Sequence, residues 1–232
     1  YNGPGNGLDS PTGIALDRFG NVYVTGWIFR QAPSDYDFAT IKYDGKTGAQ
    51  LWIATYGRPN SWDEARAIEV DDLGNVYVTG VSGIPNLNTD YVTIKYDTNG
   101  NEIWVAIYDI GDSPDEPADI AVDHSGNVYV TGKSNWDCVT IKYDKDGNQL
   151  WMAKYNGPAD DIDNGVGVEV DHSGNVYVGG ISNTGVYDLC DYVIIKYDKN
   201  GNQLWAAKYD GPGGMYDILT DITLDDAGNV YV

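Results

Sequence analysis

The sequence predicts an all-β fold, a β-propeller of four-stranded antiparallel blades, and the first observation behind this prediction is an internal repeat. Gly-Asn-Val-Tyr-Val begins at residues 20, 74, 126, 174 and 228, so successive copies lie 54, 52, 48 and 54 residues apart. Ile-Lys-Tyr-Asp keeps the same register at 41, 94, 141 and 195, as do the Trp residues at 52, 104, 151 and 205. Repeats of this length are typical of propellers.

The second observation is that each repeat divides into four short strands. In the second copy we predict them at 67–71, 75–80, 91–96 and 102–108. Asp-x-x-Gly-Asn joins the first strand to the second, and a similar turn joins the third to the fourth. Gly supplies a positive φ and the Asp or Asn side chain bonds its own backbone, which closes a tight hairpin. Gly or Pro interrupts every stretch that is long enough for a helix.

The third observation is that apolar residues occupy both faces of several strands, as in Val76-Tyr77-Val78. Strands buried on both faces imply stacked sheets, which favours a propeller over the alternative of a parallel β-helix, whose coils are shorter and lack paired hairpins. We interpret the chain, residues 1–232, as a single partial propeller of about four and a half blades. The blades are predicted at 11–56, 65–108, 117–155 and 165–209, with a half blade at 219–232.

Both ends of the sequence are predicted to lie within blades. The first four residues match those at 155–158, which follow a fourth strand, and the last residues supply two strands of a fifth repeat. Three arrangements are open: a portion of a larger propeller, which we favour, copies that complete one another's half blades, and a distorted four-bladed monomer. The second arrangement predicts self-association through unpaired half blades, as a ring or an open fibre.

The motif Asp-x-x-Gly-Asn-Val-Tyr-Val-Thr-Gly, followed by a third strand that ends in Tyr-Asp and a fourth that carries Leu-Trp, resembles the SBBP β-propeller repeat of bacterial and archaeal secreted and surface proteins. The resemblance covers nearly the whole chain. It implies an extracellular or cell-surface location and a scaffold or binding role. It implies no reaction, because these repeats share no catalytic residues.

The charge balance narrows the choice of partners. The chain has 35 Asp+Glu against 14 Lys+Arg, a formal net charge of -21, whereas nucleic acid or an anionic membrane surface requires a basic footprint. The sequence has no apolar stretch of transmembrane length. We therefore expect a protein or glycan partner, and neither nucleic-acid binding nor membrane insertion.

Aromatic residues in the variable loops are candidates for ligand binding. Length variation on a regular scaffold is where binding sites are usually built, and aromatic rings beside acidic and amide side chains suit stacking on sugar rings. The alternative, which we favour, is that these rings pack between blades. The candidates are Trp27, Trp62, Trp136, Tyr187 and Tyr216.

An Asp that recurs just before each first strand is the candidate metal ligand. If the first strand is innermost, as the family's blade order implies, the five carboxylates ring one mouth of the central channel, and clustered carboxylates bind Ca²⁺. The alternative is that each Asp caps its own inter-blade turn by accepting backbone N–H bonds. Identical placement in every repeat favours the capping role. The five are Asp9, Asp63, Asp115, Asp163 and Asp217.

The sequence shows no catalytic constellation. His124 and His172 occupy a turn position that other repeats fill with Arg or Asp, which indicates solvated surface rather than a Ser-His-Asp triad or a metal centre. Cys138 and Cys190 hold non-equivalent positions, so a disulfide between them has no support. A lysine recurs in each third strand, at 42, 95, 142 and 196, and is expected to pair with a repeated Asp, one candidate being an Asp of the adjacent blade.

Together these observations predict a non-enzymatic extracellular or cell-surface module with a structural or interaction role, such as scaffolding or adhesion within a repetitive assembly. The first alternative is a carbohydrate-binding propeller that uses the aromatic loops. The second is a carboxylate- or Ca²⁺-dependent enzyme acting on polysaccharide, because Asp and Glu are abundant although no pair of them stands out.

Overall fold

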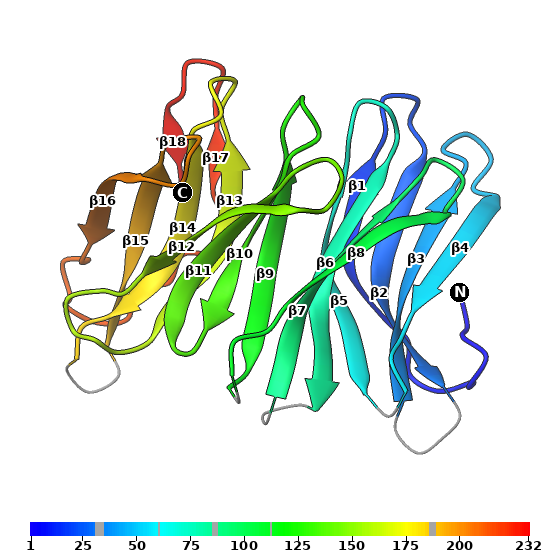
Figure 1. Ribbon diagram of the computed structural model, residues 1–232, viewed down its shortest axis with the longest axis horizontal. Coiled ribbons are helices and arrows are strands. Elements are labelled where there is room, and N and C mark those ends of the chain that lie inside the picture. Colours follow the sequence, from blue (N-terminus) through cyan, green and yellow to red (C-terminus); the bar gives the residue numbers. More distant parts are fainter. Residues whose placement is uncertain (31–34, 60, 85–87, 112, 186–188) are drawn as a thin grey trace. The chain divides into compact units, whose positions relative to one another are not determined.

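Every regular element of the computed structural model is a β-strand (Figure 1). The structure describes residues 1–30, 35–59, 61–84, 88–111, 113–185 and 189–232, and within these ranges it contains no helix. Accordingly, no helix in the described part of the chain is suited to cross a membrane. The chain divides into two compact units, Tyr1–Pro117 and Ala118–Val232. The all-β prediction is confirmed.

The first unit holds two antiparallel sheets of four strands, which we call blades 1 and 2. Blade 1 consists of β1 (Ser10–Leu16), β2 (Val22–Arg30), β3 (Asp35–Tyr43) and β4 (Gln50–Tyr56). Blade 2 consists of β5 (Trp62–Val70), β6 (Val76–Ile84), β7 (Asn88–Tyr96) and β8 (Glu102–Tyr108). Within each blade, strands that are consecutive in sequence pair with one another. A parallel bridge between Tyr36 and Trp62 joins the two blades.

The second unit repeats this plan. Blade 3 consists of β9 (Asp115–Val122), which enters the unit at Ala118, β10 (Val128–Ser134), β11 (Asp137–Tyr143) and β12 (Gln149–Tyr155). Blade 4 consists of β13 (Asp163–Val170), β14 (Val176–Asn183), β15 (Cys190–Tyr197) and β16 (Gln203–Tyr209). β17 (Thr223–Leu224) and β18 (Val230–Tyr231) form a two-stranded hairpin. The prediction of four-stranded antiparallel sheets is confirmed.

The strands extend further than the repeat motif predicts. The sequence places the first strand of blade 2 at 67–71, whereas β5 spans Trp62–Val70. A shift in register between Ala65 and Ala67 bends β5 and lets it continue pairing with β6 as far as Gly83. The same irregularity lies between Pro11 and Gly13 in blade 1. The first strands of blades 1, 2 and 4 therefore each carry a bulge that the repeat motif does not reveal.

One carboxylate organises the turn between the first and second strands of each repeat. In blade 2, Asp71 Oδ1 accepts the backbone N–H groups of Leu73 and Asn75 at 2.9 and 2.8 Å. Asp71 Oδ2 accepts the Asn75 amide at 2.7 Å and the Tyr77 hydroxyl at 3.0 Å. Gly74 takes a φ of +83°, which residues with a side chain rarely adopt. These bonds explain why Asp, Gly, Asn and Tyr recur together at fixed spacing.

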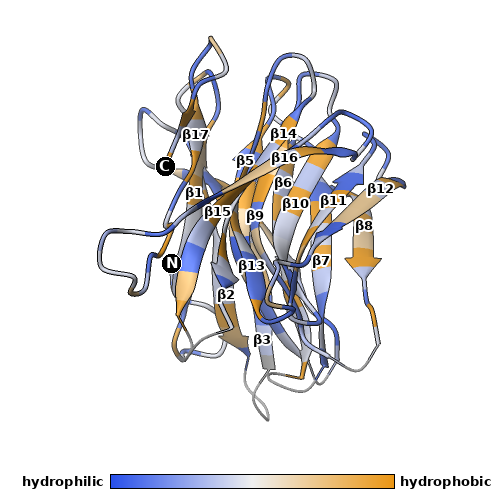
Figure 2. Cartoon of the chain, turned by 90° about the vertical axis from the view of Figure 1, so that its left-hand side faces the viewer, coloured by the Kyte–Doolittle hydropathy of each residue, from blue (hydrophilic) through white to orange (hydrophobic). Residues whose placement is uncertain are grey.

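Apolar side chains fill the space between neighbouring blades of one unit. In the first unit Tyr23 and Phe38 of blade 1 join Val76, Val78 and Ile94 of blade 2 in one core, and all five are fully buried. The core between blades 3 and 4 includes Tyr129, Val178 and Ile195. Full burial of one such aliphatic side chain stabilises a fold by about 1.5–3 kcal/mol. In Figure 2 the strands carry hydrophobic and hydrophilic colours in turn, and most of the turns carry hydrophilic colour.

Candidate functional site

The five recurring Asp residues proposed as metal ligands act as caps of the inter-blade turns. Each accepts a backbone N–H from a residue five or six positions earlier in the chain, and Asp63, Asp115 and Asp163 are buried. The donors are Gly3 for Asp9 at 2.6 Å, Arg58 for Asp63 at 2.8 Å, Ile110 for Asp115 at 2.8 Å, Gly157 for Asp163 at 2.5 Å and Gly211 for Asp217 at 2.5 Å. The hydrogen bonds therefore agree with the capping alternative.

This cap also explains the glycine of the Tyr-x-Gly-Pro segments. A Cβ on Gly3 would lie 2.9 Å from Asp9 Oδ1, and one on Gly211 would lie 2.5 Å from Asp217 Oδ1. A side chain at either position would displace the carboxylate from the N–H that it accepts. The glycine and the following Asp therefore form one structural unit.

Two of the aromatic candidates pack inside the first unit. Trp27 meets Tyr36 edge-on at 4.9 Å between ring centroids, and Trp62 stacks on the same Tyr36 at 4.6 Å with planes inclined at 29°. Trp62 comes from blade 2, whereas Trp27 and Tyr36 come from blade 1. These contacts agree with the alternative that the loop aromatics pack between blades.

Two other candidates face solvent, and the fifth, Tyr187, lies outside the described residues. Trp136 is 58% exposed and Tyr216 is 54% exposed. Trp136 also has a φ of +71°, next to Asn135 at +48°, in the two-residue loop between β10 and β11. Positive φ at both residues is typical of a type I′ turn, which usually contains Gly, Asn or Asp, so a Trp there costs backbone energy. Lys133 Nζ lies 5.5 Å from the centroid of the Trp136 ring.

A cluster of three carboxylates, Asp191, Asp210 and Asp217, is the candidate cation site of the second unit. One oxygen from each lies within 4.8 Å of the other two. Burial, followed by the negative charge of Asp210, raises the pKa of Asp191. In blades 1 and 2 the residue equivalent to Asp191 pairs with a base, Asp37 with Arg30 at 2.5 Å and Asp90 with Arg58 at 2.7 Å.

A second group of carboxylates in this unit, Asp119, Glu169 and Asp221, includes two whose pKa is raised. Burial raises the pKa of Asp119, against the effect of the Val168 backbone N–H that it accepts at 2.9 Å, and the charge of Asp221 raises it further. Burial also raises the pKa of Glu169, as do the charges of Asp119 and Asp221. Sequence reasoning named Asp217 of the first group but not Asp191 or Asp210, and it missed the second group, whose members do not hold the same position in every repeat.

The four repeated lysines pack against tyrosine rings. Each repeated lysine places its Nζ over the tyrosine ring of its own blade, at 4.9, 5.0, 4.9 and 4.6 Å for Lys42, Lys95, Lys142 and Lys196. Lys42 Nζ also lies 3.9 Å from Asp17 Oδ2, an Asp of its own blade rather than of the adjacent one.

Cys138 and Cys190 are free thiols, and burial raises the pKa of Cys138 to about 12. His124 and His172 are exposed.

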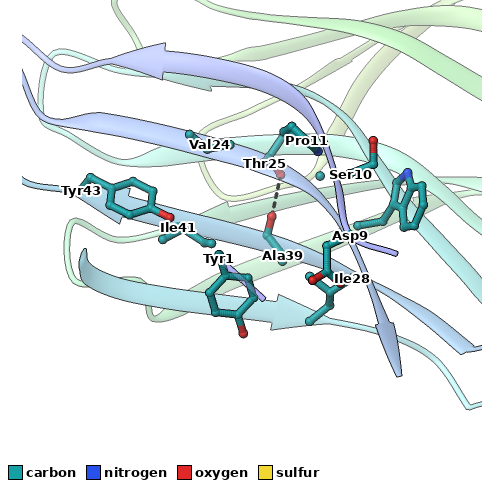
Figure 3. Close-up of a pocket in the computed structure, with 12 residues that line it drawn as sticks. Tyr1, Asp9, Ser10, Pro11, Val24, Thr25, Ile28, Ala39, Ile41 and Tyr43 are labelled. Carbon is teal, nitrogen blue, oxygen red and sulfur yellow. Dashed lines mark hydrogen bonds between the residues drawn. The ribbon is translucent and has the colours of Figure 1, made fainter. Parts of the chain in front are cut away.

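The outer face of blade 1, defined here by Ile14, Leu16, Val24, Ile41 and Tyr43, is an unusual surface for this repeat. A cavity of about 210 Å³ opens on it, and Tyr1, Ile28 and Ile41 are among the side chains that line the cavity (Figure 3). Ile14 and Leu16 are 70% and 64% exposed. The residues equivalent to Val24 and Tyr43 in blade 2 are Val78 and Tyr96, which are fully buried in the core between blades 1 and 2.

The position of Ile14 shows the difference most clearly. It lies three residues before the Asp of the first turn, and Ile68, Val168 and Ile222 hold the same position in three other repeats. These three side chains are 8%, 3% and 4% exposed. Ile68 reaches to 3.0 Å from the position that a Cβ on Gly13 would take, and Ile222 to 2.8 Å from the corresponding position on Gly167. An isoleucine at this position normally packs on the first strand of the preceding repeat.

Comparison with solved structures shows the fold. A gluconolactonase from Xanthomonas campestris superposes with a TM-score of 0.52 at 17% identity, over 94% of this chain and 66% of that one. A calcium-binding protein, regucalcin, from Agrobacterium tumefaciens superposes with a TM-score of 0.50 at 13% identity, over 87% of this chain and 75% of that one. Enzymes are thus among the proteins with this fold, and at these identities the likeness extends to the fold alone.

Sequence comparison identifies the repeat. No curated protein matches the chain. The β-propeller repeat SBBP matches residues 3–28 and 103–137. The first segment contains β1 and most of β2, and the second runs from β8 into β11. Within these two matched segments, the chain therefore carries the SBBP β-propeller repeat.

Proposed function

We propose that the chain is a non-enzymatic structural and interaction module, outside the cell or at its surface, whose copies associate head to tail. In this association the outer face of blade 1 docks on the β17–β18 hairpin of another copy. The observation that carries the proposal is the 70% exposure of Ile14 at a position that is buried in the other repeats compared above.

The contacts inside each unit indicate which surface would cover Ile14. Ile68 and Ile222 pack on Gly13 and Gly167, which lie four residues before the Asp of their turns. In the fifth repeat that position is held by Asp221, which is exposed. An Asp fits there, because Asp119 holds the same position in blade 3 and accepts the backbone N–H of Val168, the residue equivalent to Ile14 in blade 4. Asp221 would accept the N–H of Ile14 in the same way.

The energetics favour a measurable association. Full burial of one exposed aliphatic side chain contributes about 1.5–3 kcal/mol. The outer face of blade 1 presents two such side chains, Ile14 and Leu16, with Val24 and Tyr43 half-buried beside them. Association costs about 4–15 kcal/mol in lost translational and rotational freedom. The gain from these side chains reaches the lower end of that cost, so we expect a weak, concentration-dependent equilibrium. Because the two surfaces differ, the contact is heterologous and builds rings or open chains rather than a symmetric dimer.

Light scattering coupled to size-exclusion chromatography tests this proposal over a range of concentrations. We expect the wild-type mass to rise above the 25.3 kDa of one chain. Ile14→Lys should shift the protein back to one chain, because it places a charge at the contact. Leu73→Lys is the matched control, since Leu73 is 76% exposed in a turn of blade 2 and lies outside the contact. A wild-type protein that stays at the mass of one chain throughout contradicts the proposal.

A glycan ligand is the second candidate function, and the conformation of Trp136 favours it. An exposed Trp held at positive φ costs energy that a binding role would explain. Its indole face, with Lys133 beside it, suits stacking on a sugar ring with a charged neighbour. Glycan-array binding that is lost in Trp136→Ala and kept in Tyr216→Ala would support this function. Equal binding by the two variants would count against Trp136 as the contact.

We further propose Ca²⁺ as the ligand that Asp191, Asp210 and Asp217 would take. Carboxylate oxygens are the ligands that Ca²⁺ prefers, and a calcium-binding protein shares the fold. The competing outcome is an enzyme, because a gluconolactonase shares the fold too. We expect no hydrolysis of gluconolactone by the chain with CaCl₂. Turnover that disappears in Asp210→Asn would contradict the non-enzymatic function.

A further inference from the structure

Two histidines lie side by side on the surface of the second unit. His124 belongs to the first turn of blade 3 and His172 to the first turn of blade 4, and both are exposed. Their ring centroids are 5.3 Å apart and their planes are inclined at 43°. The two turns come from different repeats, and the packing of blade 3 against blade 4 brings the rings together.

The separation fits two imidazoles that share one metal ion. Zinc binds an imidazole nitrogen at about 2.0–2.1 Å and prefers tetrahedral geometry. Each ring nitrogen lies about 1.2 Å from its ring centre, so two rings on one tetrahedral ion have centres about 5 Å apart. The observed distance of 5.3 Å matches this value.

Hydrogen bonds hold the backbone of both turns in place. Asp123 Oδ1 accepts the backbone N–H groups of Ser125 and Asn127, each at 2.9 Å. Asp171 Oδ1 accepts the corresponding N–H groups of its own turn at the same distances. The histidine in each turn therefore projects from a fixed backbone, and less freedom is lost when both rings bind one ion.

We propose that His124 and His172 form a surface site for a divalent transition metal of the zinc class. Imidazole nitrogen suits Zn²⁺, Cu²⁺ and Ni²⁺, whereas Ca²⁺ and Mg²⁺ prefer oxygen. The two rings supply two ligands and water completes the shell. Other repeats place Arg18, Asp72 and Asp226 at this turn position, so the site belongs to this one pair of neighbouring blades. The bound ion bridges blades 3 and 4.

Calorimetric titration of the full chain with ZnCl₂ tests the site. We expect one zinc ion per wild-type chain at this site. His124→Gln and His172→Gln should each weaken binding by about tenfold or more, because each removes one of only two protein ligands. Glutamine suits an exposed turn position, and circular dichroism checks that the fold is kept. Zinc should also raise the melting temperature of the wild type and leave that of the double variant unchanged.

Asp210→Asn is the matched control, since it removes a carboxylate from the candidate cation cluster of the same unit. It should leave the zinc affinity unchanged. A second titration, with MgCl₂ in place of ZnCl₂, measures how strongly the net charge of -21 by itself attracts a divalent cation. Equal zinc affinity in the wild type and both histidine variants would overturn the proposal. So would zinc binding that only Asp210→Asn abolishes, or binding no stronger than that of magnesium.

Discussion

The indole N–H of Trp151 donates to the carbonyl oxygen of Lys199 at 3.1 Å, and so ties the fourth strand of blade 3 to the last turn of blade 4. Trp52 makes the same bond to Thr98, also at 3.1 Å, between blades 1 and 2. A Cβ on Gly201, in that last turn of blade 4, would lie 2.8 Å from the Trp151 ring. The Leu-Trp motif of one repeat and the Gly-containing turn of the next are therefore two halves of one contact between blades.

Loss of the indole bond should weaken the second unit. Trp151→Phe keeps an aromatic ring but removes the N–H, and a typical hydrogen bond contributes about 0.5–1.5 kcal/mol. We expect the free energy of unfolding in urea to fall by about that amount. Trp136→Phe is the control. The Trp136 ring is exposed, so its replacement by Phe should leave the free energy of unfolding unchanged or increase it. Equal effects of the two substitutions would show that the bond to Lys199 contributes nothing.

The turn carboxylates should make stability depend on pH. Burial by itself would raise the pKa of Asp123, but bonds from Asn127, Tyr129 and Ser125 bring it below its ordinary value. A lowered folded-state pKa means that the carboxylate stabilises the fold above about pH 4, its ordinary range, and that this contribution is lost as the pH falls through the folded-state value. Asp123→Ala should therefore cost about 1.5–3 kcal/mol near pH 7, the worth of hydrogen bonds to a charged group.

The difference between wild type and Asp123→Ala should shrink as the pH is lowered below about 4. Urea unfolding across the pH range measures it. Asp146→Ala provides the control, since Asp146 forms an exposed ion pair with Lys145 at 2.8 Å, and such pairs are worth about 0–1 kcal/mol. A stability difference for Asp123→Ala that stays constant down to pH 2 would show that the carboxylate charge is not what the turn uses.

Calcium should stabilise the second unit if Asp191, Asp210 and Asp217 bind it. A ligand present at a hundred times its dissociation constant stabilises the folded state by about 2.7 kcal/mol. We expect CaCl₂ to raise the melting temperature, a chelator to reverse the rise, and Asp210→Asn to abolish it. Asp217 is not substituted, because it also caps its own turn. An identical rise in wild type and Asp210→Asn would place the calcium elsewhere.

The two thiols should differ in reactivity. Burial raises the pKa of Cys138 to about 12, and its side chain is fully buried, so almost no thiolate is present or accessible at pH 8. In the Cys190→Ser variant Cys138 is the remaining thiol. The folded variant should resist a thiol reagent at this pH and react with it only in denaturant. Rapid labelling of the native variant would mean that the core between blades 3 and 4 opens frequently.

Repetition made much of the fold predictable. The Asp-x-x-Gly-Asn turns act within five residues of chain, so their chemistry is visible in the sequence. The bulge near Ala65 and Ala67 is not visible there, because it depends on how β5 pairs with β6. The carboxylates of Asp191, Asp210 and Asp217 come from three segments that only the folded chain brings together. The stacking of Trp62 on Tyr36 likewise depends on the packing of blade 1 against blade 2.

The exposure of Ile14 shows where prediction from the sequence stops. Its residue type is the same as that of Ile68 and Ile222, so the pattern alone assigns all three to the core. Only the structure shows that Ile14 is 70% exposed while the other two are 8% and 4% exposed. The repeat therefore predicts a packing position, and the exposure of Ile14 at that position marks the surface that we propose associates.

A disulfide between copies tests the head-to-tail association most directly. The contact of Ile222 with Gly167 places a side-chain carbon 2.8 Å from a Cβ position, a spacing compatible with a disulfide between paired cysteines. In Ile14→Cys/Asp221→Cys/Cys190→Ser, mild oxidation should give covalent dimers and longer chains on a non-reducing gel. The control Leu73→Cys/Asp221→Cys/Cys190→Ser should stay at the mass of one chain. Equal cross-linking of the two variants, or a bond formed only within single chains, would contradict the account.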